Sequence, residues 1–280
     1  MILLEGKKVV EKKEEELKKI SNEYFNKYKK RPSLAIFSST DNEASLAYVN
    51  RIEKHCAKFN IDVIKYEYEN LEKFEKDINL ANSSEGVTAI MFQEPLLDEL
   101  KCFVESINEQ KDVEGITSKN YGKLFLDKSD KIVPCTVKAV EDILEFYNIE
   151  VSGKKVVILG RSNIVGKPLA IELLNKNATV SVCHSKTKNI KEETINADIV
   201  IVAIGKEKYL KSDYIRDGAV VIDVGINFDV NGKMVGDVDF EDVKNKVYAI
   251  TPVPGGVGIV TNYALIENIF NCFKVQNENN

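Results

Sequence analysis

The sequence contains no tryptophan, only two histidines, and five cysteines without a Cys-x-x-Cys pair. So few nitrogen ligands and no paired thiols argue against a structural zinc site, and we expect metal-free chemistry and reduced thiols. No apolar run approaches the ~20 residues that span a bilayer. The opening residues, MILLEGKK, have too short an apolar core for a secretory signal. We therefore expect a cytoplasmic protein with no membrane partner.

The sequence also lacks an excess of positive charge, because it contains 39 Lys and Arg residues against 44 Asp and Glu residues, and its formal net charge is −5. Nucleic acids and anionic membranes attract basic surfaces, so neither is an expected partner. The 280 residues are 44% hydrophobic and 30% charged, which is ordinary for a globular chain. That length accommodates one large or two modest domains.

The first half of the chain alternates apolar, strand-like runs with charged, helical stretches. Such alternation predicts βαβ units and a mostly parallel sheet. The expected strands cover 34–39, 61–68 and 87–93, and the expected helices cover about 6–29, 42–59, 70–81 and 96–109.

The second half repeats this logic with more apolar strands, at 154–160, 178–183, 197–205, 218–225 and 246–250. Between the halves, residues 110–136 are rich in Lys, Gly, Asn and Asp. We therefore predict two α/β domains joined near 115–140. A last helix at about 258–274 follows TPVPGGVG, whose prolines and glycines permit a sharp turn back onto the first domain.

A loop typical of dinucleotide binding follows the strand KKVVILG. Gly160 ends this strand and a helix begins near Lys167, so helix N-terminal amides are available for a pyrophosphate. Ser162 stands where a second glycine is usual, and Gly166 still allows close packing of helix on strand. The motif alone equally fits a plain connection between a strand and a helix.

The end of the next strand favours NADP over NAD. NAD-binding domains place a carboxylate there for the ribose 2′-hydroxyl. This chain instead has Cys183-His184-Ser185-Lys186-Thr187, and Arg161 stands beside the first turn. A hydroxyl and cations suit a 2′-phosphate, although a polar strand end in solvent is the alternative.

Nine separated stretches, taken together, resemble the bifunctional methylenetetrahydrofolate dehydrogenase/methenyltetrahydrofolate cyclohydrolase family. The resemblance covers nearly the whole chain, and it is the joint order and spacing of the fragments that make it specific. They are AYVNRIEKHC (47–56), MFQEPL (91–96), KDVEGITSKNYGKL (111–124), PCT (134–136), GRSNIVGKP (160–168), ATVSVCHSKT (178–187), DVGIN (223–227), GDVDF (236–240) and PVPGGVG (252–258).

The resemblance implies a folate-side catalytic domain at 1–118, completed by the C-terminal helix at 258–280, and an NADP-binding Rossmann domain at 119–257. It implies oxidation of 5,10-methylenetetrahydrofolate to the methenyl cation by hydride transfer to NADP. In most members it also implies hydrolysis of that cation to 10-formyltetrahydrofolate. Homodimerisation is usual in the family, commonly through the Rossmann domains.

The resemblance also assigns site residues by motif. Tyr48 and Gln93 are the expected catalytic residues, and they bind substrate together with Glu114, Pro254 and Gly255. Gln93 ends an apolar strand, at the edge where α/β sheets bind ligands. The adjacent glycines of PVPGGVG let backbone approach a ligand closely, although a rigid hinge is an alternative role. The expected cofactor-binding residues are Gly160, Arg161, Ser162, Ser185 and Ile226, and no metal ligands are expected.

Two departures from the family pattern bear on activity. The family helix reads Tyr-Val-x-x-Lys, and its lysine is the main cyclohydrolase residue, whereas Ile52 stands at that position here. The family's KDVDG is KDVEG, so Glu114 offers its carboxylate from one methylene further out. A milder change puts Ile-Val-Thr after PVPGGVG in place of Pro-Met-Thr. We therefore expect the dehydrogenase to survive and the cyclohydrolase to be weak or absent.

Three alternatives stay open at this point. The chain is a fully bifunctional enzyme that uses another residue, such as His55, for hydrolysis, or it is a catalytically silent folate- or nucleotide-binding homologue. The third is another two-domain Rossmann oxidoreductase, such as a relative of shikimate dehydrogenase. The combination of KDVEG, Gln93 and PVPGGVG argues against the third alternative.

Overall fold

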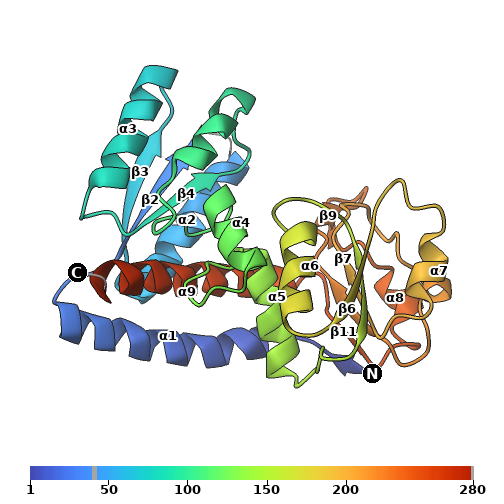
Figure 1. The fold of residues 1–280 in the computed structure, drawn as a ribbon. Helices are drawn as coiled ribbons and strands as arrows, with labels where there is room; N and C mark the ends of the chain where they lie inside the picture. The colour runs from blue at the N-terminus through green and yellow to red at the C-terminus, as the bar shows by residue number, and fades with distance from the viewer. Residues whose placement is uncertain (40–42, 279–280) are drawn as a thin grey trace. The chain divides into compact units, whose positions relative to one another are not determined.

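A computed structural model describes residues 1–39 and 43–278 of the chain (Figure 1). The chain forms two compact α/β units. The six-stranded unit comprises Met1–Lys12 and Thr136–Thr261, and the three-stranded unit comprises Lys13–Cys135 and Asn262–Asn280. The predicted two-domain α/β architecture is confirmed. The expected helix start at 42 and the end of the expected segment 258–280 lie outside the described residues.

The six-stranded unit is built on a parallel sheet in the order β1-β11-β8-β7-β5-β6. From β5 the chain moves outward to β6 and then returns to β7 on the other side of β5. The carboxyl ends of β5 and β7 therefore form a topological switch point, where such sheets bind ligands. The strands are β1 (Ile2–Leu3), β5 (Lys155–Leu159), β6 (Thr179–Cys183), β7 (Ile199–Val202), β8 (Val220–Asp223) and β11 (Ala249–Ile250).

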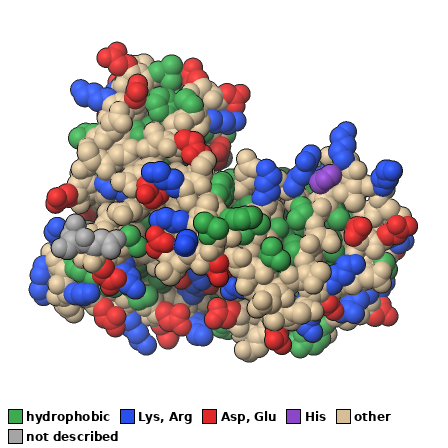
Figure 2. Space-filling view, viewed as in Figure 1, with side chains coloured by type: hydrophobic (Ala, Val, Ile, Leu, Met, Phe, Trp, Pro, Cys, Tyr) green, Lys and Arg blue, Asp and Glu red, His purple; other side chains and the backbone are tan. Residues whose placement is uncertain are grey.

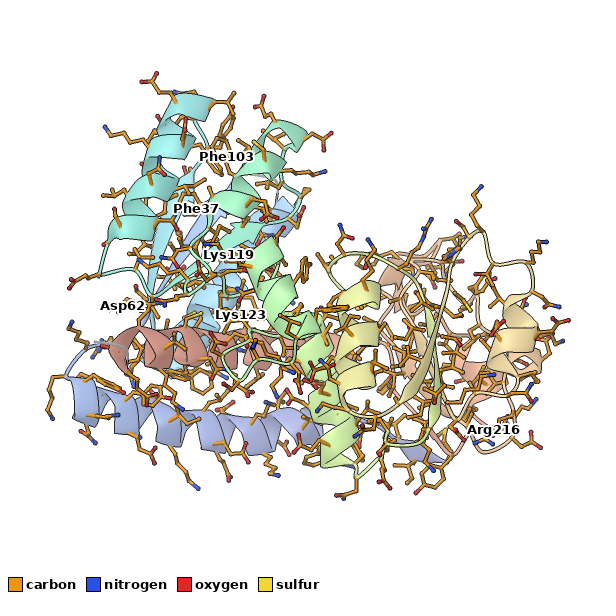
Figure 3. All side chains as sticks on the ribbon, viewed as in Figure 1. Phe37, Asp62, Phe103, Lys119, Lys123 and Arg216 are labelled. Atoms are coloured by element: carbon orange, nitrogen blue, oxygen red, sulfur yellow. The ribbon has the colours of Figure 1, made fainter. Side chains whose placement is uncertain are left out.

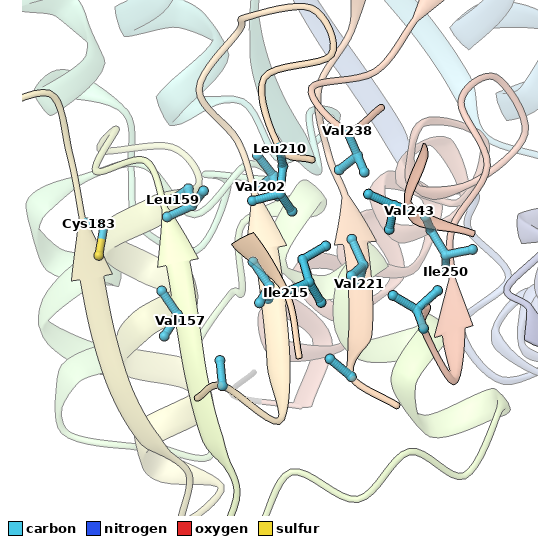
Figure 4. Packing of buried hydrophobic residues seen from close by; sticks show 14 residues of the cluster. Val157, Leu159, Cys183, Val202, Leu210, Ile215, Val221, Val238, Val243 and Ile250 are labelled. Carbon is cyan, nitrogen blue, oxygen red and sulfur yellow. The ribbon is translucent and has the colours of Figure 1, made fainter. Parts of the chain in front are cut away.

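Buried aliphatic side chains hold this sheet against its covering helices (Figure 4). Val157, Val202 and Val221 come from three neighbouring strands and are fully buried. Strands buried on both faces read as continuous apolar runs, which is why the sequence pattern revealed them. The remaining elements are α5 (Cys135–Phe146), α6 (Gly166–Asn175), α7 (Ile190–Thr194), η2 (Ser212–Tyr214), α8 (Phe240–Val243) and an antiparallel hairpin of β9 (Asn227–Phe228) and β10 (Met234–Val235).

The three-stranded unit has a parallel sheet in the order β3-β2-β4. Phe37 of the central strand stacks on Tyr66 and meets Phe74 edge to face, and Phe103 packs against the same cluster (Figure 3). The elements are α1 (Gly6–Tyr28), β2 (Ser33–Ser38), α2 (Glu43–Lys58), β3 (Asp62–Glu67), α3 (Leu71–Ser83), β4 (Ala89–Gln93), the 3-10 helix η1 (Asp98–Ser106), α4 (Ser118–Phe125) and α9 (Val257–Glu278).

The C-terminal helix α9 packs beside α1, as Figure 1 shows. The hydroxyl of Tyr263 donates to Glu14 Oε2 at 2.7 Å, and Lys13 pairs with Glu267. Further along, the rings of Tyr24 and Phe270 meet edge to face with centroids 5.9 Å apart. The expected return of the last helix to the first domain is therefore confirmed.

Three local features differ from the sequence expectation. The helix expected at 96–109 is the shorter 3-10 helix η1, which ends at Ser106. Residues 2–3 form an unexpected strand, because their backbone pairs with β11. The units also differ from the expected domain of 1–118, because residues 119–135 group with the three-stranded unit and residues 1–12 with the six-stranded unit. One contact that holds residues 119–135 there is the bond from Asn120 Nδ2 to Asp112 Oδ2, at 2.8 Å.

Surface charge of both signs is interspersed over the face drawn in Figure 2. Among the described helices, none is both long and apolar enough to cross a bilayer. Within the same residues, no cluster of His, Cys, Asp and Glu has the geometry to hold a metal ion.

Candidate active site

A pocket of about 330 Å³ opens in the three-stranded unit, at the carboxyl end of β4 and beside α2. Parallel sheets bind ligands at this edge. Three of the predicted site residues, Tyr48, Gln93 and Glu114, line it together although they are far apart in the sequence. The described lining residues are Ser45, Tyr48, Met91, Phe92, Gln93, Glu94, Pro95 and Glu114.

Gln93 is the last residue of β4 and is only 5% exposed. Its Nε2 donates to the backbone oxygen of Glu94 at 2.6 Å. Its Oε1 is buried and accepts no hydrogen bond from any described residue. A buried amide oxygen without a donor costs free energy, so it is suited to a donor that a ligand brings.

Glu114 lies in a turn that runs alongside β4, where the N–H of Ile90 donates to the carbonyl of Lys111 at 2.7 Å. Gly115 follows with φ +64°, and any side chain there would strike the carbonyl of Ile132. Burial, followed by the charges of Asp112 and Glu94, raises the pKa of Glu114 to about 8. The carboxyl group is therefore mostly protonated at pH 7.

Tyr48 projects from α2 and is half-buried. Burial, followed by the charge of Glu114, raises the pKa of Tyr48 to about 12, so it remains a neutral phenol. Five lining residues were not predicted as site residues, and two of them, Ser45 and Glu94, are polar. Ser45 lies one helical turn before Tyr48, and Glu94 directly follows Gln93. This closeness in sequence to two predicted residues was the signal that could have identified them. The carboxylate of Glu94 accepts from the N–H of Leu96 at 2.8 Å.

No Lys, Arg or His is among the described residues that line this pocket. Ile52, at the position of the family lysine, is 2% exposed and belongs to the hydrophobic core. Lys54 is exposed. His55 does not line the pocket: its ring meets Tyr263 edge to face with centroids 5.3 Å apart. Burial, followed by the charge of Lys58, lowers the pKa of His55.

A larger hollow, of about 820 Å³, lies at the opposite edge of the same sheet, where β2 and β4 begin. Its buried cation is Lys111, whose ammonium donates to the carbonyls of Ala81 and Ser84 at 2.9 and 2.7 Å. These carbonyls end helix α3, so Lys111 has a structural role in capping it. This hollow lacks the convergent site residues and is not the candidate active site.

The glycine loop of the six-stranded unit lies at the switch point between β5 and β7. Gly160 has φ +121°, and a Cβ there would lie 2.2 Å from the carbonyl oxygen of Ala203. A Cβ on Gly166 would lie 2.2 Å from the carbonyl oxygen of Gly160. Both positions therefore require glycine, and the loop can follow a ligand's phosphates closely. Ser162 Oγ accepts from the N–H groups of Val165 and Gly166, which leaves its own hydrogen to donate.

The loops after β5 and β6 emerge side by side, because Leu159 pairs with Cys183 and the N–H of Gly160 donates to the carbonyl of Cys183 at 2.9 Å. Arg161 and Ser185 are both exposed on these loops. Three bonds close the second loop. The N–H of His184 donates to Thr187 Oγ1, the N–H of Lys186 donates to His184 Nδ1, and the N–H of Thr187 donates to the carbonyl of His184. Predicted residues Arg161, Ser162 and Ser185 are thus on adjacent strand ends.

Ile226 follows β8 and is 57% exposed, which leaves it free for contact with a ligand. A Cβ on Gly258 would lie 3.8 Å from Ile226 Cδ1. Pro254 and Gly255 lie between β11 and α9 in the same six-stranded unit, not among the residues that line the pocket. Their assignment to the substrate stays a prediction.

Two family models match consecutive parts of the chain. Residues 4–114 match the tetrahydrofolate dehydrogenase/cyclohydrolase catalytic domain, and residues 134–277 match the NAD(P)-binding domain of the same family. The second match covers the glycine loop and Ser185.

Relatives over the full length agree. "Bifunctional protein FolD" of Dictyoglomus thermophilum is 44% identical over 98% of this chain and 97% of its own. The crystal structure of the bifunctional enzyme FolD from Campylobacter jejuni has a TM-score of 0.94 at 42% identity, with 99% of each chain covered. The Trypanosoma brucei enzyme, complexed with NADP cofactor and an inhibitor, has a TM-score of 0.90 at 32% identity, covering 99% of this chain and 98% of its own.

Proposed function

Because the chain belongs to the tetrahydrofolate dehydrogenase/cyclohydrolase family, we propose that it oxidises 5,10-methylenetetrahydrofolate to 5,10-methenyltetrahydrofolate with NADP. One observation carries the proposal: Tyr48, Gln93 and Glu114 meet in one pocket at the carboxyl end of a parallel sheet. Family membership also removes the shikimate dehydrogenase alternative.

The pocket would bind the pterin ring through its polar residues. A reduced pterin presents N–H donors along its amide-like edge, and Glu114 and the free Oε1 of Gln93 are acceptors suited to them. The phenol of Tyr48 would pack against the folate. Bound NADP supplies the hydride acceptor. The reacting carbon lies between two nitrogens whose lone pairs stabilise the developing cation, so the protein mainly has to position the substrate.

The acidic character of the pocket supports dehydrogenation more than hydrolysis. The methenyl product is a cation, and the titratable residues among the described lining are Tyr48, Glu94 and Glu114. A carboxylate near the developing cation stabilises it, and the cation in turn favours the ionised form of Glu114. Hydrolysis additionally needs proton transfers to and from water and the leaving ring nitrogen. With Ile52 in the core in place of a lysine, we propose that the cyclohydrolase activity is weak or absent.

NADP is the proposed cofactor in preference to NAD. Gly160 and Gly166 leave room for the pyrophosphate, and Ser162 retains a hydroxyl donor. Arg161 and Ser185 are exposed on adjacent loops, and the strand end at 183–187 carries no carboxylate that would repel a 2′-phosphate.

We also propose a homodimer formed through the six-stranded unit. Phe228 and Val230, on the β9–β10 hairpin, are 65% and 98% exposed, and exposed apolar side chains close together favour a protein interface. Light scattering of the purified protein should give twice the chain mass. A monomer at micromolar concentration would exclude the proposal.

One spectrophotometric experiment tests the activity. Purified protein is mixed with methylenetetrahydrofolate and either NADP or NAD, and formation of methenyltetrahydrofolate is followed by its absorbance. Decay of added methenyltetrahydrofolate is then compared with the rate without protein. Formation with NADP and no accelerated decay is expected. No formation with either cofactor would point to a catalytically silent homologue, and accelerated decay to a fully bifunctional enzyme.

A further inference from the structure

Two buried carboxylates organise the loops at the carboxyl ends of β7 and β8. Asp237 is fully buried. Its Oδ2 accepts from the N–H groups of Ile204 and Gly205 at 2.7 and 3.0 Å, and its Oδ1 accepts from the N–H of Lys206 at 2.8 Å. Three successive amides of the loop after β7 thus converge on one side chain from a segment some thirty residues away.

Asp237 also holds the loop after β8. Its Oδ1 accepts from Asn227 Nδ2 at 2.9 Å. Asp223, the last residue of β8, accepts through Oδ1 from the N–H groups of Gly225 and Asp237, at 2.9 and 3.0 Å. Ile226 therefore lies between two residues that are each hydrogen-bonded to this carboxylate pair.

Gly225 of the motif DVGIN and Gly236 of the motif GDVDF make room for these carboxylates. A Cβ on Gly225 would lie 2.3 Å from Asp237 Cγ, and one on Gly236 would lie 1.8 Å from Asp223 Oδ2. Side chains at these two positions would displace the carboxylates from their donors. The glycines of DVGIN and GDVDF thus serve this network.

The network stands next to the glycine loop but on the side away from Ser185. Ala203, immediately before the three amides, is the residue whose carbonyl a Cβ on Gly160 would strike. A dinucleotide crosses such a sheet at the switch point, with its two halves on opposite sides. If the adenosine 2′-phosphate lies near Ser185 beyond β5, the nicotinamide half extends over β7 and β8.

We propose that Asp237 and Asn227 are positioning residues for the nicotinamide half of the cofactor, acting by fixing residues 204–206 and Ile226. This inference rests on the proposed use of NADP. Neither side chain need touch the cofactor, since both act through backbone and through Ile226. Loosening them should affect the nicotinamide end and leave the adenosine end unchanged.

The test compares two ligands in two variants. Asn227→Ala removes one bond to Asp237 and leaves the three loop amides paired. Asp237→Asn keeps the size of the side chain but replaces one acceptor oxygen by a donor. The control is Asp242→Asn, because Asp242 also accepts a backbone N–H group, from Ser212 at 2.7 Å, but on the exposed surface of the same unit. The ligands are NADP and adenosine 2′,5′-bisphosphate, which carries the 2′-phosphate but no nicotinamide.

Calorimetry should show NADP binding weakened about tenfold in both variants, because bound NADP must then re-order loops that have lost the equivalent of one hydrogen bond to a charged group. Binding of the bisphosphate should be unchanged, kcat should fall, and KM for methylenetetrahydrofolate should stay constant. Asp242→Asn should match the unmodified protein. Equal weakening of both ligands would mean general damage to the unit and would overturn the inference, as would unchanged NADP binding in Asn227→Ala. Absence of NADP binding by the unmodified protein would instead overturn the proposed function and the inference with it.

Discussion

Glu114 shares a pocket with Tyr48, and its charge is second only to burial in raising the pKa of Tyr48 to about 12. The protonation state of Glu114 and the binding of a ligand beside Tyr48 therefore depend on each other. Glu114 itself is a half-buried acid with a pKa of about 8, so its protonation changes within the range where the enzyme can be assayed.

Substrate capture should improve as pH rises towards 8. A carboxyl group whose pKa is raised to about 8 is protonated below that pH, and only the carboxylate accepts two N–H groups from the pterin. The value of kcat/KM for methylenetetrahydrofolate should therefore rise between about pH 6 and 8 and level off above it, since kcat/KM reports groups of the free enzyme. KM for NADP should show no such dependence. A flat profile for the folate substrate would remove Glu114 from the site.

Glu114→Gln should raise KM for methylenetetrahydrofolate and leave NADP affinity nearly unchanged. Loss of a charged hydrogen bond in a partly buried site costs about 1–3 kcal/mol. The same variant should abolish the pH dependence, because its amide does not titrate. A matched control is Glu105→Gln, because Glu105 accepts from Ser118 on the exposed surface of the same unit. Unchanged folate kinetics in Glu114→Gln would make Glu114 a structural residue of its turn.

Ser185→Asp should weaken NADP far more than NAD. The substitution places an anion beside the expected 2′-phosphate, and like charges brought together are strongly unfavourable, so kcat/KM with NADP should fall by at least about tenfold. Ser152→Asp is the control. Ser152 is exposed in the turn that precedes β5 in the same unit, and it is therefore far from the carboxyl ends of the strands, where Ser185 lies. Equal kcat/KM for the two cofactors in the unmodified enzyme would refute the NADP preference.

Much of the fold was predictable because both sheets are parallel and buried. Most of their strands read as near-continuous apolar runs, although β3 and β6 carry polar residues and are partly exposed. Gln93 and Gly160 mark where two of the apolar runs end. Strand β1 was not predictable, because two residues carry no periodicity and only backbone pairing with β11 defines them. The 3-10 helix η1 was read as a longer helix because apolar spacings of three and four residues look alike over so short a stretch.

The candidate site was partly predictable for a similar reason. Gln93 is marked by a strand end and Glu114 by a motif, but Asp237 is recognisable only through bonds to amides distant in sequence. His55 was a candidate for hydrolysis, and it follows Tyr48 by seven residues, which bring the chain back to the same face of a helix. They also advance it by about 10 Å along the axis. His55 accordingly contacts Tyr263 and does not line the pocket.

The unmodified protein should not accelerate the decay of methenyltetrahydrofolate. Water attack on the cation needs a base, and the ring nitrogen that leaves must be protonated. Ile52 does neither, and Arg51 on the same helix is exposed and does not line the pocket. His55→Ala should leave the slow decay unchanged, whereas robust decay in the unmodified protein that disappears in His55→Ala would identify a substitute base.

Ile52→Lys tests the same point in the opposite direction. Its side chain would begin in the core, where a cation is costly, so it should lower the melting temperature unless the ammonium reaches the pocket beside Tyr48. Ile52→Met, which is neutral and similar in volume, controls for packing. Accelerated decay in Ile52→Lys but not in Ile52→Met, with dehydrogenation retained in both, would show that the missing amine alone separates the two activities. Accelerated decay in the unmodified protein and in all variants would show that the pocket's own acids, Glu94 and Glu114, suffice for hydrolysis.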